Sequence, residues 1–192
     1  MQSYCKRITR VQVINTSNKL SRLINVVAPK LLVKAQVYKF CGTEKLSEPY
    51  EYQIAFILPS ESLLQLQTKK LLNNFIIWRL HAHGMNKYFH GMISKISVVK
   101  NHYTITVEPV LKCLQYDMQY RVFSKKTYPD IIETILGKLP GVKFDISALD
   151  ISSYTKIPHI TQYAKNSLQF LHDIIAMAGI NYLFVHDIVN KS

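Results

Sequence analysis

The chain has 192 residues, of which 48% are hydrophobic and 19% charged, and its formal net charge is +12. A chain of this length buries a core without disulfides or metals, and this composition is that of a globular protein. The apolar run 23–33 is interrupted by Asn25, Pro29 and Lys30 and falls short of the roughly 20 residues that a span needs, so we expect no transmembrane helix.

The basic residues gather toward the N-terminus, where eight lysines and arginines precede the first acidic residue, Glu44. Plain solubility is the simplest explanation of this excess, and an acidic protein partner or nucleic acid are the alternatives. No apolar stretch with a small-residue cleavage site follows the first basic residues, so we expect no signal peptide. Cys5, Cys41 and Cys113 are widely spaced without a CxxC pair, which favours thiols in a reducing cytoplasm over a disulfide framework.

The segment from residue 1 to about 115 has the pattern of short antiparallel strands. We expect strands near 11–14, 23–27, 33–42, 53–58, 75–82, 87–99 and 103–111, a hairpin turn at 84–86, and a short helix followed by a loop within 60–73. Such strands satisfy their edges best by closing on one another. We therefore predict an antiparallel β-barrel over residues 1–115.

The strand at 103–111 has the clearest alternation. Tyr103, Ile105 and Val107 point to one face, together with Pro109 and Leu111, whereas Thr104, Thr106 and Glu108 point to the other. One face of this strand is therefore expected to be buried and the other wet.

Residues 116–192 change to a helical period and predict a small α/β domain. Thr127 is a good N-cap, with Pro129 and Asp130 in the first turn, and predicts a helix near 128–138. A short strand is expected at 142–146.

A second helix is expected near 167–178. Asn166 can cap it, with Gln169 completing a capping box, and Gly179 can end it in the left-handed conformation. The following residues, 180–185, have a strand-like pattern. The whole chain is then α+β and mainly β.

Four blocks of residues occur in a familiar order. They are Gly42, Glu44, Leu46, Ser47, Pro49, Tyr50 and Tyr52; then Phe89, His90 and Gly91; then Arg121, Phe123, Ile131, Ile132, Ile135 and Leu136; and finally Gln162, Tyr163, Ser167, Phe170, Leu171, Gly179, Ile180, Tyr182, Phe184 and His186. In this order they resemble the N-terminal region of VgrG proteins, the spike proteins of type VI secretion systems, which are related to the baseplate hubs of contractile phage tails. The chain departs from that pattern at 164–166, where a charged run is usual, and at His172, where arginine is common.

The resemblance implies a hub-like barrel followed by a small α/β domain, in a structural protein without catalytic residues or cofactors. In this family the hub region trimerises and docks on the hexameric, Hcp-like inner tube of a contractile injection apparatus. The matched positions are expected to be packing residues, namely Phe89, Gly91, Phe123, Ile132, Leu136, Tyr163, Phe170, Leu171, Gly179, Tyr182 and Phe184.

In that family a second barrel, an OB-like domain and a β-helical needle normally follow the α/β unit. None of them fits into the few residues after His186, so we expect a fragment, split subunit or remnant that trimerises poorly. By the same resemblance, the protein is expected in the cytoplasm during assembly and outside the cell once it is secreted with the apparatus.

Three histidines are the metal candidates. His81 and His83 share one face of a strand, and His90 could approach them across the hairpin. No carboxylate or cysteine accompanies them, which favours ordinary packing or surface histidines and no metal.

Two His-Asp pairs, His172-Asp173 and His186-Asp187, invite comparison with hydrolases. No GxSxG elbow or recognisable nucleophile accompanies them, so we expect no enzyme activity. The alternative function is a standalone basic module that binds nucleic acid or an acidic protein.

Overall fold

The computed structural model describes residues 2–6, 11–13, 36–57, 71–82 and 85–186, with the backbone alone for 2–6, 11–13, 36, 79–82 and 85–86. The chain forms two compact units. Unit 1 comprises Met1–Pro109 and Phe184–Ser192, and unit 2 comprises Val110–Leu183. Within the described residues, no helix combines the length and the apolar character that crossing a membrane requires.

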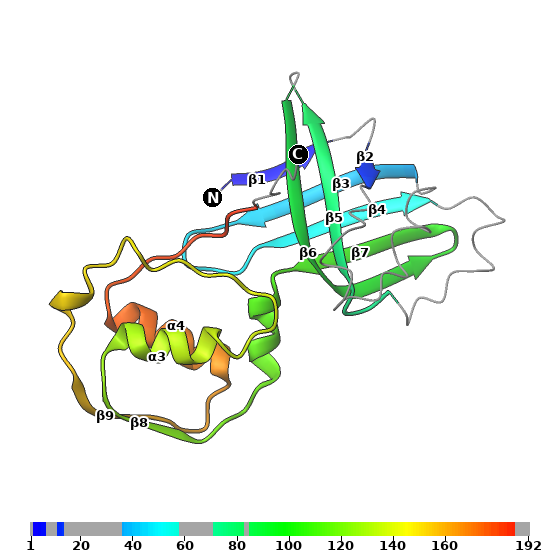
Figure 1. Ribbon diagram of the computed structural model, residues 1–192. Coiled ribbons are helices and arrows are strands. Elements are labelled where there is room, and N and C mark those ends of the chain that lie inside the picture. Colours follow the sequence, from blue (N-terminus) through cyan, green and yellow to red (C-terminus); the bar gives the residue numbers. More distant parts are fainter. Residues whose placement is uncertain (1, 7–10, 14–35, 58–70, 83–84, 187–192) are drawn as a thin grey trace. The chain divides into compact units, whose positions relative to one another are not determined.

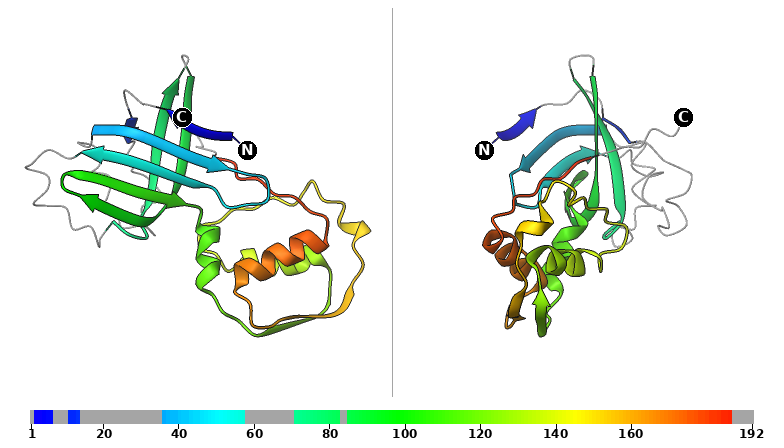
Figure 2. Two further views of the ribbon diagram at one scale, coloured as in Figure 1. Left: turned by 180° about the vertical axis from the view of Figure 1, so that it is seen from behind. Right: turned by 60° about the vertical axis from the view of Figure 1, so that its left-hand side comes forward.

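Unit 1 is a curled antiparallel sheet of seven strands, in the order β1-β3-β4-β7-β6-β5-β2. The strands are β1 (Gln2–Lys6), β2 (Val11–Val13), β3 (Gln36–Glu44), β4 (Glu51–Ile57), β5 (Phe75–Ala82), β6 (Met85–Val99) and β7 (His102–Glu108). Figures 1 and 2 show the sheet rolling so that β5 and β6 run steeply across the direction of β3 and β4. The sheet is a half-barrel, and no pairing joins its end strands β1 and β2 in the part of the chain that the structure describes. The predicted mainly β, antiparallel fold is thus confirmed.

The long strand β6 turns the sheet. Its first half pairs with β5, from Ala82↔Met85 to Phe75↔Met92, and its second half pairs with β7, ending at Val99↔His102. The register against β7 shifts between Ile93 and Lys95. Such a bulge bends a strand and increases its local twist. The hairpin predicted from the turn at 84–86 is therefore present, and its second strand also builds the next pair.

The inner face of this sheet carries the core of unit 1. In β7, Tyr103, Ile105 and Val107 are buried as their alternation predicted, although Glu108, expected on the wet face, is buried too. The core residues are Phe40, Tyr50, Tyr52, Ile54, Phe56, Leu71, Ile76, Trp78, Phe89, Ile93, Tyr103, Ile105 and Val107, with Val37, Ile96 and Phe184 packed against them. Aromatic rings therefore supply much of the apolar area that stabilises this unit.

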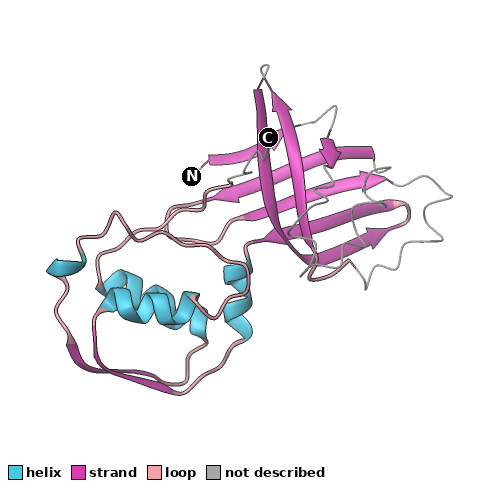
Figure 3. Ribbon diagram, viewed as in Figure 1, coloured by secondary structure: helices cyan, strands magenta, loops and turns pink. Residues whose placement is uncertain are grey.

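Unit 2 consists of two helices, a two-stranded sheet and 3₁₀ turns, as Figure 3 shows. Its elements are η2 (Val110–Tyr116), β8 (Arg121–Lys126), α3 (Tyr128–Leu136), η3 (Ile151–Ser153), β9 (Ile157–Gln162) and α4 (Ser167–Met177). β8 and β9 pair antiparallel, from Arg121↔Gln162 to Lys126↔Ile157. The two helices pack on each other, and α4 also contacts η2.

Helix α3 begins as its sequence predicts. The Thr127 hydroxyl accepts a hydrogen bond from the backbone N–H of Asp130, and the Asp130 carboxylate accepts one from the backbone N–H of Thr127, which forms a capping box. Ile131, Ile132 and Ile135 form the buried face of the helix.

Helix α4 begins at Asn166, whose side chain accepts from the N–H of Gln169; the return bond of a capping box is not recorded among the described residues. It ends in a Schellman motif, because Gly179 has φ +66° and the N–H groups of Gly179 and Ile180 bond to the carbonyls of Ala176 and Ile175. The predicted glycine stop is confirmed.

Two predicted strands of the second half are wrong. Residues 142–146 and 180–185 have no strand, because the ladder partner of β8 is β9 and no strand pairs with either segment in the described structure. The predicted strand at 23–27 and most of the segment 60–73 lie outside the described residues.

The division into units differs from the one expected at residue 115. Residues 110–116 form η2, which packs on α4 and so belongs to unit 2. Residues 184–186 belong to unit 1, where Phe184 packs against the core.

Candidate functional site

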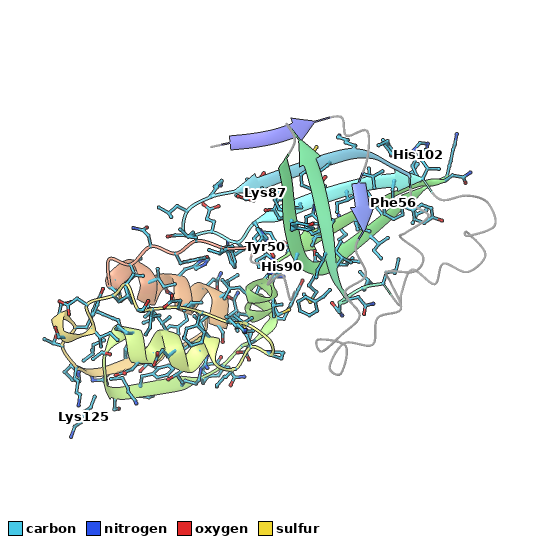
Figure 4. All side chains as sticks on the ribbon, turned by 45° about the horizontal axis from the view of Figure 1, so that its top comes forward. Tyr50, Phe56, Lys87, His90, His102 and Lys125 are labelled. Carbon is cyan, nitrogen blue, oxygen red and sulfur yellow. The ribbon has the colours of Figure 1, made fainter. Side chains whose placement is uncertain are left out.

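Three of the four motif blocks meet at one place in unit 1, which we call the histidine cluster: Glu44, Tyr50, Tyr52, Phe89, His90 and His186. The ring of His186 lies 4.9 Å from that of Tyr50, 5.4 Å from that of Phe89 and 4.8 Å from that of His90, between centroids. Figure 4 labels Tyr50 and His90, which come from separate strand regions and lie together. Residues more than 130 positions apart are thereby joined, since Tyr52 and His186 differ by 134.

The hydrogen bonds of the histidine cluster select one neutral form of His186. The Tyr52 hydroxyl donates to Glu44, so its oxygen can accept from His186 Nε2, which lies 3.1 Å away. The backbone N–H of His90 donates to His186 Nδ1 at 3.4 Å. The network therefore assigns the proton of a neutral His186 to Nε2 and leaves Nδ1 as the acceptor.

This environment resists protonation of His186. Burial lowers the pKa of His186 from 6.5 to about 4, and the neighbouring His90 and Lys87 act in the same direction against the opposing effect of Glu44. A second proton would sit on Nδ1, which already faces the N–H of His90. His186 is therefore a neutral packing and hydrogen-bonding group at pH 7.

The two tyrosines are also held in their neutral forms. Burial, reinforced by the charge of Glu44, raises the pKa of Tyr50. Burial, followed by the hydrogen bond to Glu44, raises the pKa of Tyr52. Their hydroxyls therefore remain hydrogen-bond donors, and that of Tyr50 donates to the carbonyl of His90 at 2.7 Å.

Gly91 makes room for this arrangement. A Cβ at this position would lie 2.6 Å from Val107 Cγ1 and 3.1 Å from the Tyr50 hydroxyl. The first of these contacts is shorter than real Cβ contacts and the second is tight, so the close packing of Val107 and Tyr50 requires glycine at position 91.

Three further motif positions, Arg121, Gln162 and Ser167, join Asp117 in a polar network in unit 2, in which Gln162 and Ser167 are buried and Asp117 and Arg121 half-buried. Arg121 donates from Nε and Nη2 to Gln162 Oε1, at 2.9 and 2.6 Å, and from Nη2 to Ser167 Oγ at 2.8 Å. Ser167 in turn donates to Asp117 at 2.6 Å. Gln162 and Ser167 are both 0% exposed, so these bonds replace all of their contacts with water.

The network contains one carboxylate and one guanidinium, joined through the serine. The hydrogen bond from Ser167 lowers the pKa of Asp117, and Gln119 and the charge of Arg121 contribute in the same direction. Arg121 Nη1 is buried and has no hydrogen-bond partner among the described residues, while its guanidinium lies 5.8 Å from the centroid of the Phe123 ring. Phe123 also stacks on Phe170. The aromatic rings of Phe123 and Phe170 thus pack beside the polar network.

Most predicted packing residues lie in these two places. In unit 1, Phe89 and Gly91 are buried and Phe184 packs on Tyr50. In unit 2, the buried positions are Ile132, Phe170 and Leu171. Phe123 and Leu136 of the same unit are half-buried. Gly179 acts through its positive φ instead of by packing. Tyr163 departs from the prediction: its ring is 72% exposed, because it follows the last ladder pair of β9 and points away from the helices.

The structure does not bring the metal candidates His81 and His90 together. In the hairpin register His81 pairs with Asn86 and His90 with Ile77, four residues apart on β6, or about 13 Å along the strand. His83 and the side chain of His81 lie outside the described residues, and His90 contacts His186. His172 of the first His-Asp pair hydrogen-bonds to Tyr182 at 2.9 Å, and Asp187 of the second lies outside the described residues.

Sequence reasoning missed Asp117 and the roles of Tyr52 and His186. Asp117 carries no local signal, because its partner Ser167 is 50 residues away. Tyr52 and His186 were recognised as matched positions, but only the fold reveals that they touch.

Several known proteins are similar to this chain. VgrG1b, a type VI secretion system spike protein of Pseudomonas aeruginosa, is 28% identical over 177 residues, covering 87% of this chain and 23% of that protein. VgrG1 of Vibrio cholerae, an actin cross-linking toxin, is 27% identical over 77% of this chain and 13% of its own length. The chain therefore spans less than a quarter of either relative.

A solved structure shares the fold. It is the E. coli c3393 protein, described as a component of the type VI secretion system with structural similarity to the T4 bacteriophage tail proteins gp27 and gp5. The TM-score is 0.61 with 19% sequence identity, over 93% of this chain and 45% of that one. Residues 43–190, which include both the histidine cluster and the polar network, match the phage tail baseplate hub (GPD) family. The chain belongs to the phage tail baseplate hub family.

Proposed function

We propose that this chain is a structural, non-catalytic hub component of a type VI secretion apparatus that docks on the inner tube. The observation that carries the proposal is the family match over 43–190, which extends across both units. The similarity to VgrG spike proteins favours a type VI apparatus over a phage tail. The histidine cluster supports a structural role for the motif residues, because the hydroxyls of Tyr50 and Tyr52 and the ring nitrogens of His186 make hydrogen bonds within the protein.

The proposed partner is a hexameric, Hcp-like inner-tube protein. We propose that the curled sheet of unit 1 faces the tube, by analogy with the barrels of the hub proteins that this chain resembles. By the same resemblance, the protein acts in the cytoplasm during assembly and outside the cell after secretion. Self-association of the isolated chain is proposed to be weak.

Light scattering with size exclusion tests this proposal. The chain is measured alone and after mixing with the inner-tube protein from the same source, at matched salt. Elution of the chain together with tube rings supports docking, and a monomer when alone supports weak self-association. A chain that ignores the tube rings at tens of micromolar would contradict the docking, and a stable trimer in dilute solution would contradict the weak self-association.

A charge control separates docking from attraction of a basic protein to any acidic surface. The formal charge of +12 makes such attraction plausible on general grounds. A specific complex keeps a fixed stoichiometry when salt is raised from 50 to 300 mM, whereas binding that disappears in that range and that an oligonucleotide reproduces would favour the basic-module alternative.

A further inference from the structure

The outer face of the β8–β9 ribbon in unit 2 carries an apolar patch that the hub function leaves unexplained. We call the ribbon patch Met118, Tyr120, Val122 and Tyr163, whose exposed fractions are 56%, 71%, 65% and 72%. The rings of Tyr120 and Tyr163 contact each other edge to face at 5.7 Å. Exposed tyrosines of this kind are enriched at protein interfaces, and a contiguous apolar patch is a mark of one.

Strand geometry places Tyr120, Val122 and Tyr163 on one face, and Met118 precedes them at an isolated bridge to Asn166. Arg121 and Phe123 point inward to the polar network and to Phe170, so their neighbour Val122 points outward. Tyr120 and Tyr163 flank the Arg121↔Gln162 pair on the continuation of the same ladder. The patch is therefore held on a paired backbone with its side chains directed away from the helices.

The exposed charges next to the ribbon patch are mainly basic. Residues 118–126 and 156–163 contain the exposed Lys125, Lys126 and Lys156 and no aspartate or glutamate, whereas Arg121 points inward to the polar network. Lys126 and Lys156 are close enough in space to lower the pKa of Asp130 together with its cap hydrogen bonds. An acidic partner is thus complementary to the patch, and a second copy of this chain is repelled by it.

The two edges of the ribbon differ. The sheet has only β8 and β9 in the described structure, so each strand has one unpaired edge. Pro158 removes an N–H donor from β9, as proline commonly does in edge strands, whereas β8 contains no proline. From Arg121 to Ser124 the edge of β8 keeps its donors in regular strand geometry, whereas Lys125 has φ +52° and is left out of the ladder.

We propose that the ribbon patch is a docking site for an extended acidic segment of another protein, which adds to the edge of β8. Its backbone would pair with residues 121–124, and its apolar side chains at alternate positions would cover Val122 and the two tyrosines. Its carboxylates would face Lys125 and Lys126. Strand addition of this type takes its affinity from main-chain hydrogen bonds and its specificity from alternate side chains.

The probe is a fluorescein-labelled peptide of four Glu-Val repeats, tested by anisotropy against the full chain. We expect saturable binding that a Lys-Val peptide does not show and that a central proline in the Glu-Val peptide abolishes. Hydrogen exchange in the complex should slow at residues 121–124 and not at 157–162. No saturable binding, or slowing on β9 alone, would overturn the proposal.

Matched charge-reversal variants test whether Lys125 and Lys126 attract the acidic peptide. Lys125→Glu with Lys126→Glu should weaken binding about tenfold, since each cross-strand charge pair contributes up to about 1 kcal/mol. Lys138→Glu with Lys143→Glu makes the same charge change at exposed positions outside the ribbon and should leave binding within about twofold. Equal weakening by both pairs would reduce the effect to net charge and overturn the site.

The same experiment distinguishes two other possible ligands of the ribbon patch. An oligothymidylate that binds more tightly than the Glu-Val peptide and loses affinity on Tyr120→Ala would assign the patch to nucleic acid and overturn the proposal. Concentration-dependent self-association that Val122→Glu abolishes would assign it to a second copy and would also overturn it.

Discussion

The two units place their motif residues in chemically opposite environments. In unit 1 the histidine cluster surrounds a neutral imidazole with aromatic rings, and its pKa is lowered by burial. In unit 2 the polar network holds Asp117 in its charged form beside Arg121, with the aspartate pKa lowered by a hydrogen bond from Ser167. Both arrangements fix one protonation state, but they lose it at different pH and through different substitutions.

The single tryptophan allows the units to be followed separately. Trp78 is the only tryptophan of the chain and is buried in the core of unit 1, so its fluorescence reports that unit. The described α-helices α3 and α4 both belong to unit 2, so the far-ultraviolet helical signal reports mainly the second. A change in stability can therefore be assigned to one unit.

The largest effect is expected for Gln162→Leu. It removes the acceptor of two Arg121 donors and leaves a half-buried charge without its main partner, which costs about 2–3 kcal/mol of unfolding free energy. Urea unfolding followed by helical circular dichroism measures it. The double variant Arg121→Met with Gln162→Leu removes both polar ends and should recover much of the loss. If Gln162→Leu alone unfolds with the same free energy as the parent, the polar network contributes little to the stability of unit 2 and the proposed difference between the units is wrong.

In unit 1 the corresponding substitution is Gly91→Ala. The added Cβ meets Val107 at 2.6 Å and the Tyr50 hydroxyl at 3.1 Å, so overpacking should cost about 1–3 kcal/mol. Tryptophan fluorescence during urea unfolding measures it, and Ser97→Ala on the exposed face of β6 is the control. A Gly91→Ala midpoint equal to that of the control would show that the FHG glycine is not needed for packing.

The two units are expected to respond differently to acid. The folded-state pKa of His186 is about 4, below 6.5, so the unfolded chain takes up a proton first as the pH falls. Unit 1 should have its full stability above pH 6.5 and lose about 1–2 kcal/mol between pH 6.5 and 4, after discounting for solvent screening. The carboxylates of unit 2 with lowered pKa, Asp117 and Asp130, stabilise above 3.8 and lose that contribution only below it.

His186→Phe is the control for this window. The ring is kept and the titrating nitrogens are removed, so the stability of unit 1 should become nearly flat between pH 6.5 and 4 even if it is lower at pH 7. A slope that survives the substitution would assign the acid sensitivity to another group.

The smallest effect is expected for Tyr163→Ser. Its side chain is mostly exposed and its ring contacts that of the similarly exposed Tyr120, so the free energy of unfolding should change by less than about 0.5 kcal/mol. Thermal denaturation followed by circular dichroism measures it. A loss above 1 kcal/mol would return Tyr163 to the packing role that its motif position predicted.

Local signals predicted the elements well and their partners poorly. Capping residues and apolar period located α3 and α4, and the alternation of Tyr103, Ile105 and Val107 located β7, because these signals act within a few residues. Residues 142–146 and 180–185 were wrong as strands, since a strand requires a ladder partner and β8 pairs with β9 instead. Extended sequence preference alone does not select that partner.

The histidine cluster shows the same limit for the site. His186 lies 134 residues from Tyr52 and 96 from His90, so no periodicity in the sequence connects them. The matched motif positions pointed to the right residues, but assigned most of them simply to packing. Their hydrogen bonds, and the opposite charge states of the two clusters, follow only from the fold.

Residue-level hydrogen exchange at pH 7 and pH 5 tests the central contrast most directly. With rates corrected for the intrinsic effect of pH, opening free energies in β4 and β6 should fall by about 1 kcal/mol at pH 5, while those in α3 and α4 stay unchanged. In His186→Phe both units should keep the same values at the two pH values. An equal decrease in both units, or a decrease confined to α3 and α4, would contradict the account that a neutral histidine stabilises the first unit and a charged network the second.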